Sequence, residues 1–383
     1  MHTPSPERGF TLVELLVSLT ITLLVTGAAL TTFSNALTVN DSAAQLSDAN
    51  QNLRAGTNQL IRDLMQAGRI IGPEGIPLPT GAGVQAFSRP GPVAGLTFNL
   101  VVDDDTTLNL PSITTGYQLG PTINGSRTDI VTIMTVDEFM PVLQTPPTVP
   151  ATPTAVEGTI APDGRSVTLP TTSLWITGDT TNDTPPIQKG DLVLFKNPKG
   201  MAMVTVTSTD STHIYFGAND PIDWFHFNQF SVPQVPIVLI KQVADTTTAW
   251  TQRTTMFRAL MITYYVDNTT TPEAPRLVRQ LNHCPAATPD CLLFEPQALA
   301  GIVEDLDLTY DLVDGVNNPT NVTSLPFTGS GVTYNSNQIR KVNVHIGVRS
   351  EVVSKPAQDY IRNHLSTSVD VRSLASVDRY ANQ

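Results

Sequence analysis

The sequence predicts an α+β protein in which a long N-terminal helix, membrane-spanning in its first half, packs on a mainly antiparallel β-sheet head with long loops. An apolar run opens at Phe10 and continues to about Phe33, which predicts the helix. The 30 prolines and 24 glycines, together with Thr and Val in short runs, predict strands joined by loops, because β-branched residues suit strands whereas Pro and Gly break them. About 310 residues follow the helix, enough for one large or two smaller domains.

The apolar run is the first part of a longer helix. About 20 apolar residues suffice to cross a bilayer, so residues 10–33 are long enough to span one. Apolar residues then recur at near-helical spacing over residues 34–70, and no proline occurs between Pro6 and Pro73. We therefore expect one rod of nearly 60 residues, about 90 Å long, with its second, amphipathic half lying against the head.

A single carboxylate, Glu14, lies in the first turn of the apolar run. An ionised carboxylate in the hydrocarbon core costs roughly 2.5 to 3.5 kcal/mol, so such a group normally has a partner and a function. A cut between Gly9 and Phe10 creates a free α-amino group one helical turn before Glu14, and in a packed assembly the carboxylate reaches a neighbour's amine instead. Gly9 suits a protease that needs close backbone approach, because glycine has no Cβ. We predict that Glu14 makes an assembly contact.

The junction RG/FTLVE resembles the type IV prepilin signal at every position of that motif, with Gly9 before the cut, Phe10 after it and Glu14 as the fifth mature residue. The resemblance implies cleavage by prepilin peptidase, methylation of the new N-terminus on Phe10, and a pilin-like fold. It divides the chain into a leader peptide (1–9), a transmembrane and assembly helix (10–33), the amphipathic continuation of that helix (34–70) and a β-rich head (71–383).

An ordinary secretory signal peptide is the alternative interpretation, with Ala28 and Ala29 as its small-residue cleavage site. The apolar run is too long for such a peptide, whose apolar region spans about 7 to 15 residues. The leader also holds one arginine balanced by Glu7, and a helical pattern continues beyond the run. The prepilin interpretation accounts for more of these features.

Several segments of the head have strand patterns. They are Arg127–Met134, Gln188–Phe195, Met261–Asn268, Arg276–Gln280, Gly301–Gly315 and Arg340–Glu351. The third and fourth are separated by a Thr- and Pro-rich turn and predict a hairpin. The last two alternate apolar and polar residues with period two, so we expect them to pair in a sheet.

The order of these segments resembles that of the PilW-like minor pilins. In that family the prepilin signal is followed by a strand with an Asp, a GDLV turn, a hairpin ending in Arg, a VEDL-x-x-x-Y strand and a final strand ending in VRS. The matching positions here are Asp129, Gly190–Val193, Arg279, Val303–Tyr310 and Val348–Ser350. Residues 141–186, rich in Thr and Pro, fit this order poorly and are expected to form an insertion or a long loop.

The only two cysteines are Cys284 and Cys291. Their six-residue spacer holds two prolines and can fold back far enough to close a disulfide, which a compartment outside the cytoplasm favours. His283 beside Cys284 raises a metal site as an alternative, but the loop offers no clear fourth ligand and the spacing matches no zinc signature. We predict a disulfide over a metal site or free thiols.

Charge and motifs argue against nucleic-acid binding and catalysis. The net charge is −12 and no run of Lys or Arg occurs, so direct nucleic-acid binding is not expected. The histidines are scattered, and no HExxH, GxSxG or Gly-rich phosphate loop is present, so we predict no catalytic residue, no cofactor and no enzyme. Two acidic clusters, Asp103–Asp105 and Asp311 with Asp314 and Asn317, are better explained by turns than by cation sites.

An aromatic segment, WFHFNQF, holds Trp224, Phe225, Phe227 and Phe230. Exposed aromatic patches mark interfaces, which makes this segment the best candidate for a contact surface. Burial in the core of the head is the favoured alternative, because large aromatic side chains are mostly buried.

The resemblance implies a minor type IV pilin that helps initiate or cap pilus assembly. A head of this size on every subunit would crowd a thin filament, which favours a minor over a major subunit. The expected partners are prepilin peptidase, other minor and major pilins, and inner-membrane lipid before assembly, with the head in the periplasm and later on the pilus. A minor pseudopilin of type II secretion and a membrane-tethered adhesin are the alternatives, and the segment order favours the pilus.

Overall fold

The structure of the chain is a computed structural model. It describes residues 10–72, 75–80, 84–92, 96–100, 108–140, 143–145, 158–161, 164–181, 184–197, 200–217, 220–229, 254–282, 295–354 and 358–371. The chain divides into two compact units, one formed by Met1–Gln51 and Arg349–Asn363 and the other by Asn52–Val348 and His364–Gln383.

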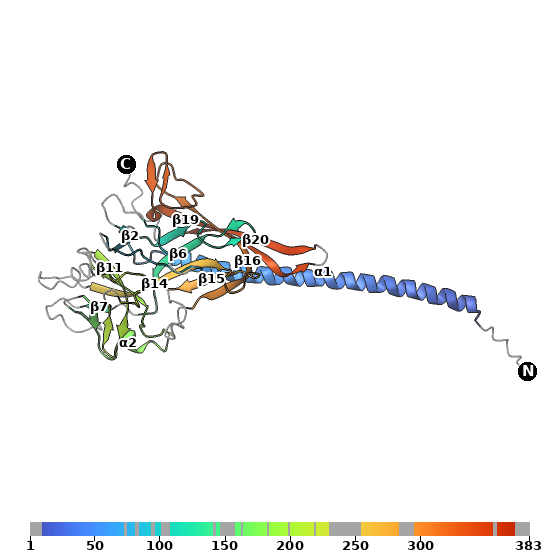
Figure 1. Cartoon of the computed structure of the whole chain (residues 1–383), viewed down its shortest axis with the longest axis horizontal. Helices are drawn as coiled ribbons and strands as arrows, with labels where there is room; N and C mark the ends of the chain where they lie inside the picture. The colour runs from blue at the N-terminus through green and yellow to red at the C-terminus, as the bar shows by residue number, and fades with distance from the viewer. Residues whose placement is uncertain are drawn as a thin grey trace, which may run out of the picture. The chain divides into compact units, whose positions relative to one another are not determined.

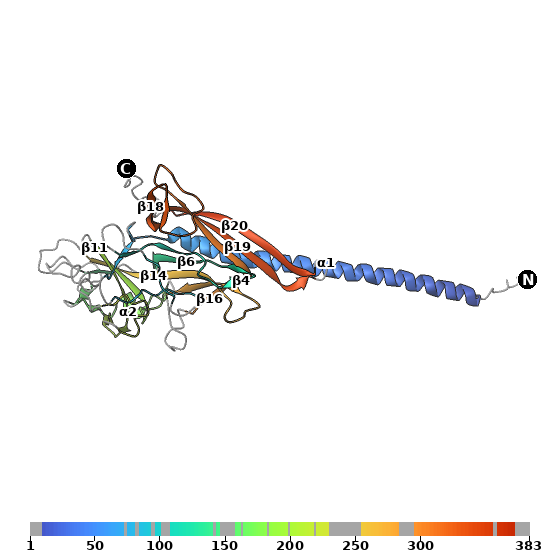
Figure 2. The same cartoon turned by 45° about the horizontal axis from the view of Figure 1, so that its top comes forward.

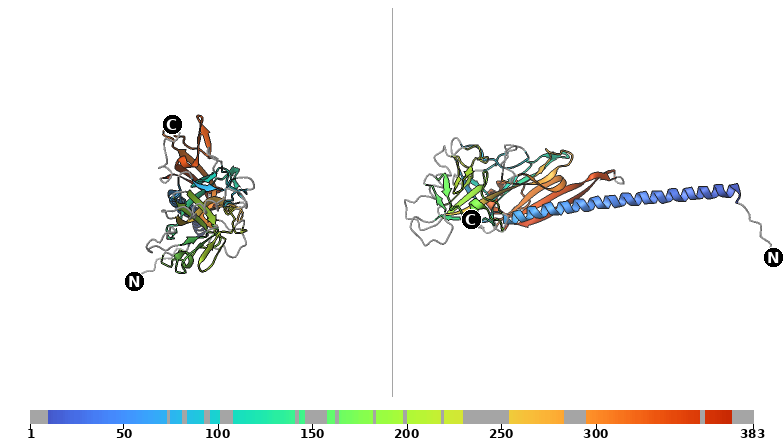
Figure 3. Two further views of the ribbon diagram at one scale, coloured as in Figure 1. Left: turned by 90° about the vertical axis from the view of Figure 1, so that its left-hand side faces the viewer. Right: turned by 90° about the horizontal axis from the view of Figure 1, so that it is seen from below.

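The N-terminal helix α1 is continuous from Leu12 to Gln66, 55 residues, as the sequence predicts (Figure 1, Figure 3). Hydroxyl groups in its apolar part donate to carbonyl oxygens one turn earlier; Thr20 Oγ1, for example, lies 2.8 Å from the carbonyl oxygen of Leu16. These bonds satisfy the hydroxyls within the helix, so they suit a lipid environment. By length and composition this helix is able to cross a membrane.

The last turns of α1 pack on the β-sheet of the larger unit. Leu53, Leu60 and Leu64 are buried there, with Leu60 and Leu64 fully inaccessible. Gly56 lies against the sheet so closely that a Cβ at this position would be 3.0 Å from Cβ of Ala300. Glycine therefore permits the close approach of helix and sheet. The result is the predicted α+β, pilin-like arrangement of a long apolar helix on a large antiparallel sheet.

The main sheet has ten strands, and all the strand pairs resolved in it are antiparallel. Its longest path is β11-β10-β14-β15-β16-β19-β20, while β6 and β7 pair with β14 and β3 pairs with β6. The strands are β3 (Ile113–Gly116), β6 (Ile130–Val136), β7 (Leu143–Thr145), β10 (Leu192–Asn197), β11 (Gly200–Thr205), β14 (Thr254–Asp267), β15 (Arg276–Leu281), β16 (Gln297–Leu312), β19 (Ile339–Ser354) and β20 (Asp359–Asp370).

Two pairings predicted from the sequence are confirmed. Strands β14 and β15 form the expected hairpin, with Asp267 opposite Arg276. Strands β16 and β19 are neighbours, with Leu308 opposite Val344. Strand β20, which lies beside β19 (Figure 2), is not among the predicted strands, although Ile361, Leu365 and Val369 repeat with the spacing of one strand face.

Smaller elements complete the larger unit. They are β1 (Ile76–Leu78) paired with β2 (Leu108–Leu110), β4 (Thr122–Ile123) with β5 (Ser126–Arg127), β17 (Phe327–Gly329) with β18 (Val332–Tyr334), a four-stranded sheet of β12 (Ser208–Thr209), β13 (His213–Tyr215), β9 (Ser166–Thr168) and β8 (Thr159–Ile160), the one-turn helix α2 (Leu174–Thr177) and the 3-10 turn η2 (Ser336–Gln338). Residues 141–186 thus contain β7, which belongs to the main sheet, β8 and β9, which belong to the four-stranded sheet, and the helix α2.

The aromatic segment contributes to the core rather than to a contact surface. Phe225 and Phe227 are fully buried and stack on each other, with ring centroids 5.4 Å apart. Phe87 stacks on Phe227 at 5.8 Å. The core interpretation is therefore confirmed for these two residues, and the interpretation of them as an exposed surface is wrong. Trp224 is half-buried, and Phe230 lies outside the described residues.

Candidate functional site

The start of α1 is a capping box formed by Thr11 and Glu14. Glu14 Oε2 accepts hydrogen bonds from the backbone N–H of Thr11 at 3.0 Å and from its hydroxyl at 2.9 Å. In return, Thr11 Oγ1 accepts from the backbone N–H of Glu14 at 3.3 Å. The pattern satisfies two donors that a helix start leaves unpaired, and the negative charge lies at the positive end of the helix dipole.

This geometry adds a role to Glu14 that the sequence analysis missed. The signal was present, because Thr11-Leu-Val-Glu14 has the S/T-x-x-E spacing of a capping box. The carboxylate lies one turn from Phe10, a residue that is 88% exposed, while Gly9 lies outside the described residues. An assembly contact by Glu14 remains a prediction, now for a carboxylate already held in place by Thr11.

The apolar half of α1 has no packing partner among the described residues. Every residue from 10 to 37 is exposed, including large side chains such as Leu12, Leu24 and Phe33. Apolar surface on this scale is stable only in lipid or against other apolar helices. The surface of this stretch is therefore suited to lipid or to packing against other apolar helices.

Polar side chains of α1 and the main sheet form contacts between elements that are distant in the sequence. Asp63 of α1 accepts from Arg279 Nε of β15 at 2.7 Å and from the Tyr264 hydroxyl of β14 at 2.6 Å. Gln59 donates to the other carboxylate oxygen at 3.2 Å. Burial and the Asp63 carboxylate raise the pKa of Tyr264, so the phenol stays a donor at neutral pH. These contacts fix the helix on the sheet.

Asp129 joins two further parts of the head. Its carboxylate accepts from the backbone N–H of Gln118 at 2.7 Å and from that of Leu308, in β16, at 2.9 Å. Burial raises the pKa of Asp129 to about 6, with Asp307 and Asp305 adding to the effect and the two N–H donors opposing it. Asp129, directly before β6, thus links the turn after β3 to strand β16.

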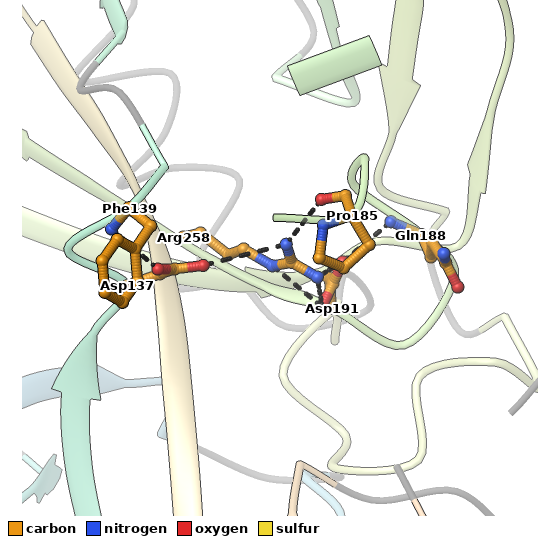
Figure 4. A network of polar contacts seen from close by, with 6 residues as sticks. All are labelled: Asp137, Phe139, Pro185, Gln188, Asp191 and Arg258. Carbon is orange, nitrogen blue, oxygen red and sulfur yellow. Dashed lines mark hydrogen bonds and ion pairs between the residues drawn. The ribbon is translucent and has the colours of Figure 1, made fainter. Parts of the chain in front are cut away.

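Asp191, in the GDLV turn, forms a buried ion pair with Arg258 of β14 (Figure 4). Arg258 Nη2 lies 3.0 and 2.9 Å from the two carboxylate oxygens, and its Nη1 donates to the carbonyl oxygen of Pro185 at 3.0 Å. Gly190, at φ of 84°, provides the left-handed turn that directs Asp191 inward. The contact joins the end of the 141–186 segment to the main sheet.

The remaining predicted sites are of two kinds. Cys284, Cys291 and Asp103–Asp105 lie outside the described residues. Asp314 Oδ1 accepts from the backbone N–H groups of Val316 at 2.7 Å and Asn317 at 2.8 Å, so its carboxylate serves a turn. In the described part of the chain, no group of three or more His, Cys, Asp or Glu residues is arranged to hold a metal ion.

Comparison with known proteins identifies the N-terminus alone. Residues 4–30 match the family model described as the prokaryotic N-terminal methylation motif. The match includes Gly9, Phe10 and Glu14 and extends well into the apolar half of α1. No curated protein and no solved structure is significantly similar to the chain.

Proposed function

We propose that this chain, a pilin-like structural protein with a prepilin-type methylation motif and not an enzyme, is a minor subunit that helps initiate or cap a type IV pilus. Prepilin peptidase would cut between Gly9 and Phe10, and Phe10 would then be methylated on its new α-amino group. The observation that carries the proposal is the motif at residues 4–30, which runs directly into a 55-residue helix whose apolar half is entirely exposed.

The size of the head supports a minor rather than a major subunit. The last turns of α1 are fixed to a ten-stranded sheet by the Asp63–Arg279 ion pair. A head of this size on every subunit would crowd a thin filament, whereas a few copies at the tip or base need not pack side by side. The proposed partners are accordingly other minor and major pilins, which contact the rod through its apolar half.

In this proposal the chain lies in the inner membrane before it enters the filament. The exposed apolar stretch anchors the chain in the inner membrane before assembly, with the head in the periplasm, and then passes into the helix bundle of the pilus. Glu14 neutralises an α-amino group during this transfer, its own or that of a neighbour. The capping box holds the carboxylate at the helix end, where such an amine would lie.

The first experiment determines the N-terminal residue and intact mass of the mature protein from its native host. N-methylated Phe10 is expected. A start near Ala29 or at Met1 would overturn the proposal in favour of a secreted or anchored binding protein. A Gly9→Val variant should remain uncut and stay in the inner membrane.

A second experiment separates the charge of Glu14 from its capping role. Glu14→Gln keeps a capping-box residue but removes the charge, whereas Thr11→Val removes the cap and keeps the charge. We expect Glu14→Gln to be cleaved normally yet poorly incorporated into filaments, and Thr11→Val to be incorporated better than Glu14→Gln. Ser18→Ala, one turn further along, is the matched control. Normal incorporation of Glu14→Gln would disprove the charge role.

Deletion of the gene tests which filament the subunit serves. Fewer pili with normal protein secretion is the expected result. Loss of secretion with a normal number of pili would replace the proposal with a minor pseudopilin of type II secretion, since both machineries use the processed N-terminus.

A further inference from the structure

An open groove lies on one face of strands β16, β19 and β20, within the larger unit. It has a volume of about 370 Å³ and is lined by Asp307 and Thr309 of β16, Asn343, Val344 and His345 of β19, and Ser366, Thr367 and Ser368 of β20. All of these side chains except that of Val344 carry a hydrogen-bonding group. Neither the proposed cleavage nor the proposed helix packing uses this face.

The groove is an ordered grid rather than a random polar surface. Asp307 pairs with His345 and Thr309 with Asn343 in the β16–β19 register. Each of these two pairs is the start of a row that β20 extends. His345 Nδ1 lies 2.8 Å from Ser366 Oγ, and Ser368 Oγ donates to Asn343 Oδ1. Neighbouring strands lie about 4.8 Å apart and successive rows about 7 Å apart. Donors and acceptors are thus spaced on the scale of a sugar ring.

Asn343 connects the rows. Its Nδ2 donates to Thr309 Oγ1 at 3.3 Å and to Asp311 Oδ1 at 3.0 Å, while its Oδ1 faces Ser368. These bonds use both hydrogens of the amide and hold it in one orientation, which leaves one lone pair of Asn343 Oδ1 to accept from a ligand hydroxyl without reorganisation.

A pair of stacked imidazoles borders the grid. The rings of His345 and His364 lie 5.4 Å apart between centroids, at an interplanar angle of 13°. Gly347 makes room for this stack, because a Cβ there would lie 2.9 Å from His364 Nδ1. A flat ring beside hydroxyl, amide and carboxylate groups is the combination that packs the C–H face of a sugar and binds its hydroxyls.

The charge of the groove lining limits the class of ligand that can bind there. The lining includes the exposed Asp307 carboxylate and no Lys or Arg, and the carboxylate of Asp305, next along the same strand face, lies 3.8 Å from His345 Nε2. Phosphates and acidic sugars would be repelled, whereas uncharged hydroxyls would donate to the carboxylate. A peptide strand would pair with the edge of a sheet, and this groove lies on a face.

We propose that the groove formed by β16, β19 and β20 binds an uncharged oligosaccharide. This activity goes beyond the proposed role in pilus assembly and does not depend on it. A head with this groove attaches the filament or the cell to a glycan surface.

Binding is tested with the full-length protein in a detergent without a sugar headgroup, since a maltoside would compete for the groove. Ligand-observed NMR titrations use cellotetraose, maltotetraose and chitotetraose as probes, with tetragalacturonate as the acidic counterpart. Saturable binding of at least one neutral tetrasaccharide in the range of about 1 mM is expected, without binding of tetragalacturonate. Absence of saturation by all three neutral probes at about 10 mM would overturn the proposal.

Variants locate the binding. Asn343→Ala and Ser366→Ala should each weaken it by at least about fivefold. Glu351→Ala, an exposed carboxylate on β19 outside the groove, is the matched control and should have no effect. Thermal unfolding confirms that each variant is folded, and two groove variants are used so that a misfolded one does not decide the result. Unchanged affinity in a folded groove variant would place the binding elsewhere and disprove the assignment.

Discussion

Replacement of Arg279 with Met tests whether the Asp63 contact fixes the helix on the sheet. Asp63 is 4% exposed and Arg279 16% exposed as side chains, with 2.7 Å between Nε and Oδ2. Removal of one partner of a buried pair costs about 3–5 kcal/mol. Asp63 keeps the Tyr264 hydroxyl at 2.6 Å, and Arg279 is partly solvated, so we expect a loss of about 2–3 kcal/mol in the free energy of unfolding.

Urea unfolding, followed by the fluorescence of the buried Trp175, measures this loss. With a slope of about 2–3 kcal/mol per molar urea, the midpoint should decrease by about 1 M. Arg276→Met removes an exposed arginine from the same strand and should leave the midpoint nearly unchanged. A double-mutant cycle with Asp63→Asn should show a coupling of about 1–3 kcal/mol. Equal effects of Arg279→Met and Arg276→Met, or a coupling near zero, would refute the reasoning.

Three further predictions concern the head and α1. The pKa of Asp129 is raised from 3.8 to about 6 in the folded chain, so the folded state binds more protons than the unfolded state between these pH values. As pH rises from about 4 to above 6, the free energy of unfolding should therefore decrease by about 1–2 kcal/mol through this group. An unchanged pH dependence of unfolding in Asp129→Asn would contradict this. Arg258→Met leaves the buried Asp191 without its ion pair and should cost about 3–5 kcal/mol in urea unfolding, and a loss below about 1 kcal/mol would contradict the pairing. Leu60→Ala, at a fully buried position, should lower the free energy of unfolding by about 2–5 kcal/mol. Leu46→Ala, at a 38% exposed position, should lower it by less than about 1 kcal/mol. Equal losses for the two variants in urea unfolding would contradict the burial of Leu60.

Short-range patterns in the sequence determined the elements that the structure confirms. The absence of proline between Pro6 and Pro73 allowed one long helix, because only proline removes both a helix hydrogen bond and the space for the preceding carbonyl. Alternating residues in Gly301–Gly315 and Arg340–Glu351 predicted two strands that pair, since the period of two is a property of each strand alone. The capping box at Thr11 and the spacing in β20 were equally local signals, although the sequence analysis did not use them.

Tertiary structure decided everything that depends on residues far apart in the chain. Asp63 and Arg279 are 216 residues apart, and Asp129 is 179 residues from Leu308, so no local pattern shows that they meet. The same reason applies to the burial of Phe225 and Phe227, whose composition suits a core and an interface alike, because burial depends on what packs against a side chain. The sequence by itself determined a prepilin-type apolar helix with a β-rich head; the fold decided which polar residues are locked inside that head and which, as in the groove of β16, β19 and β20, line its surface.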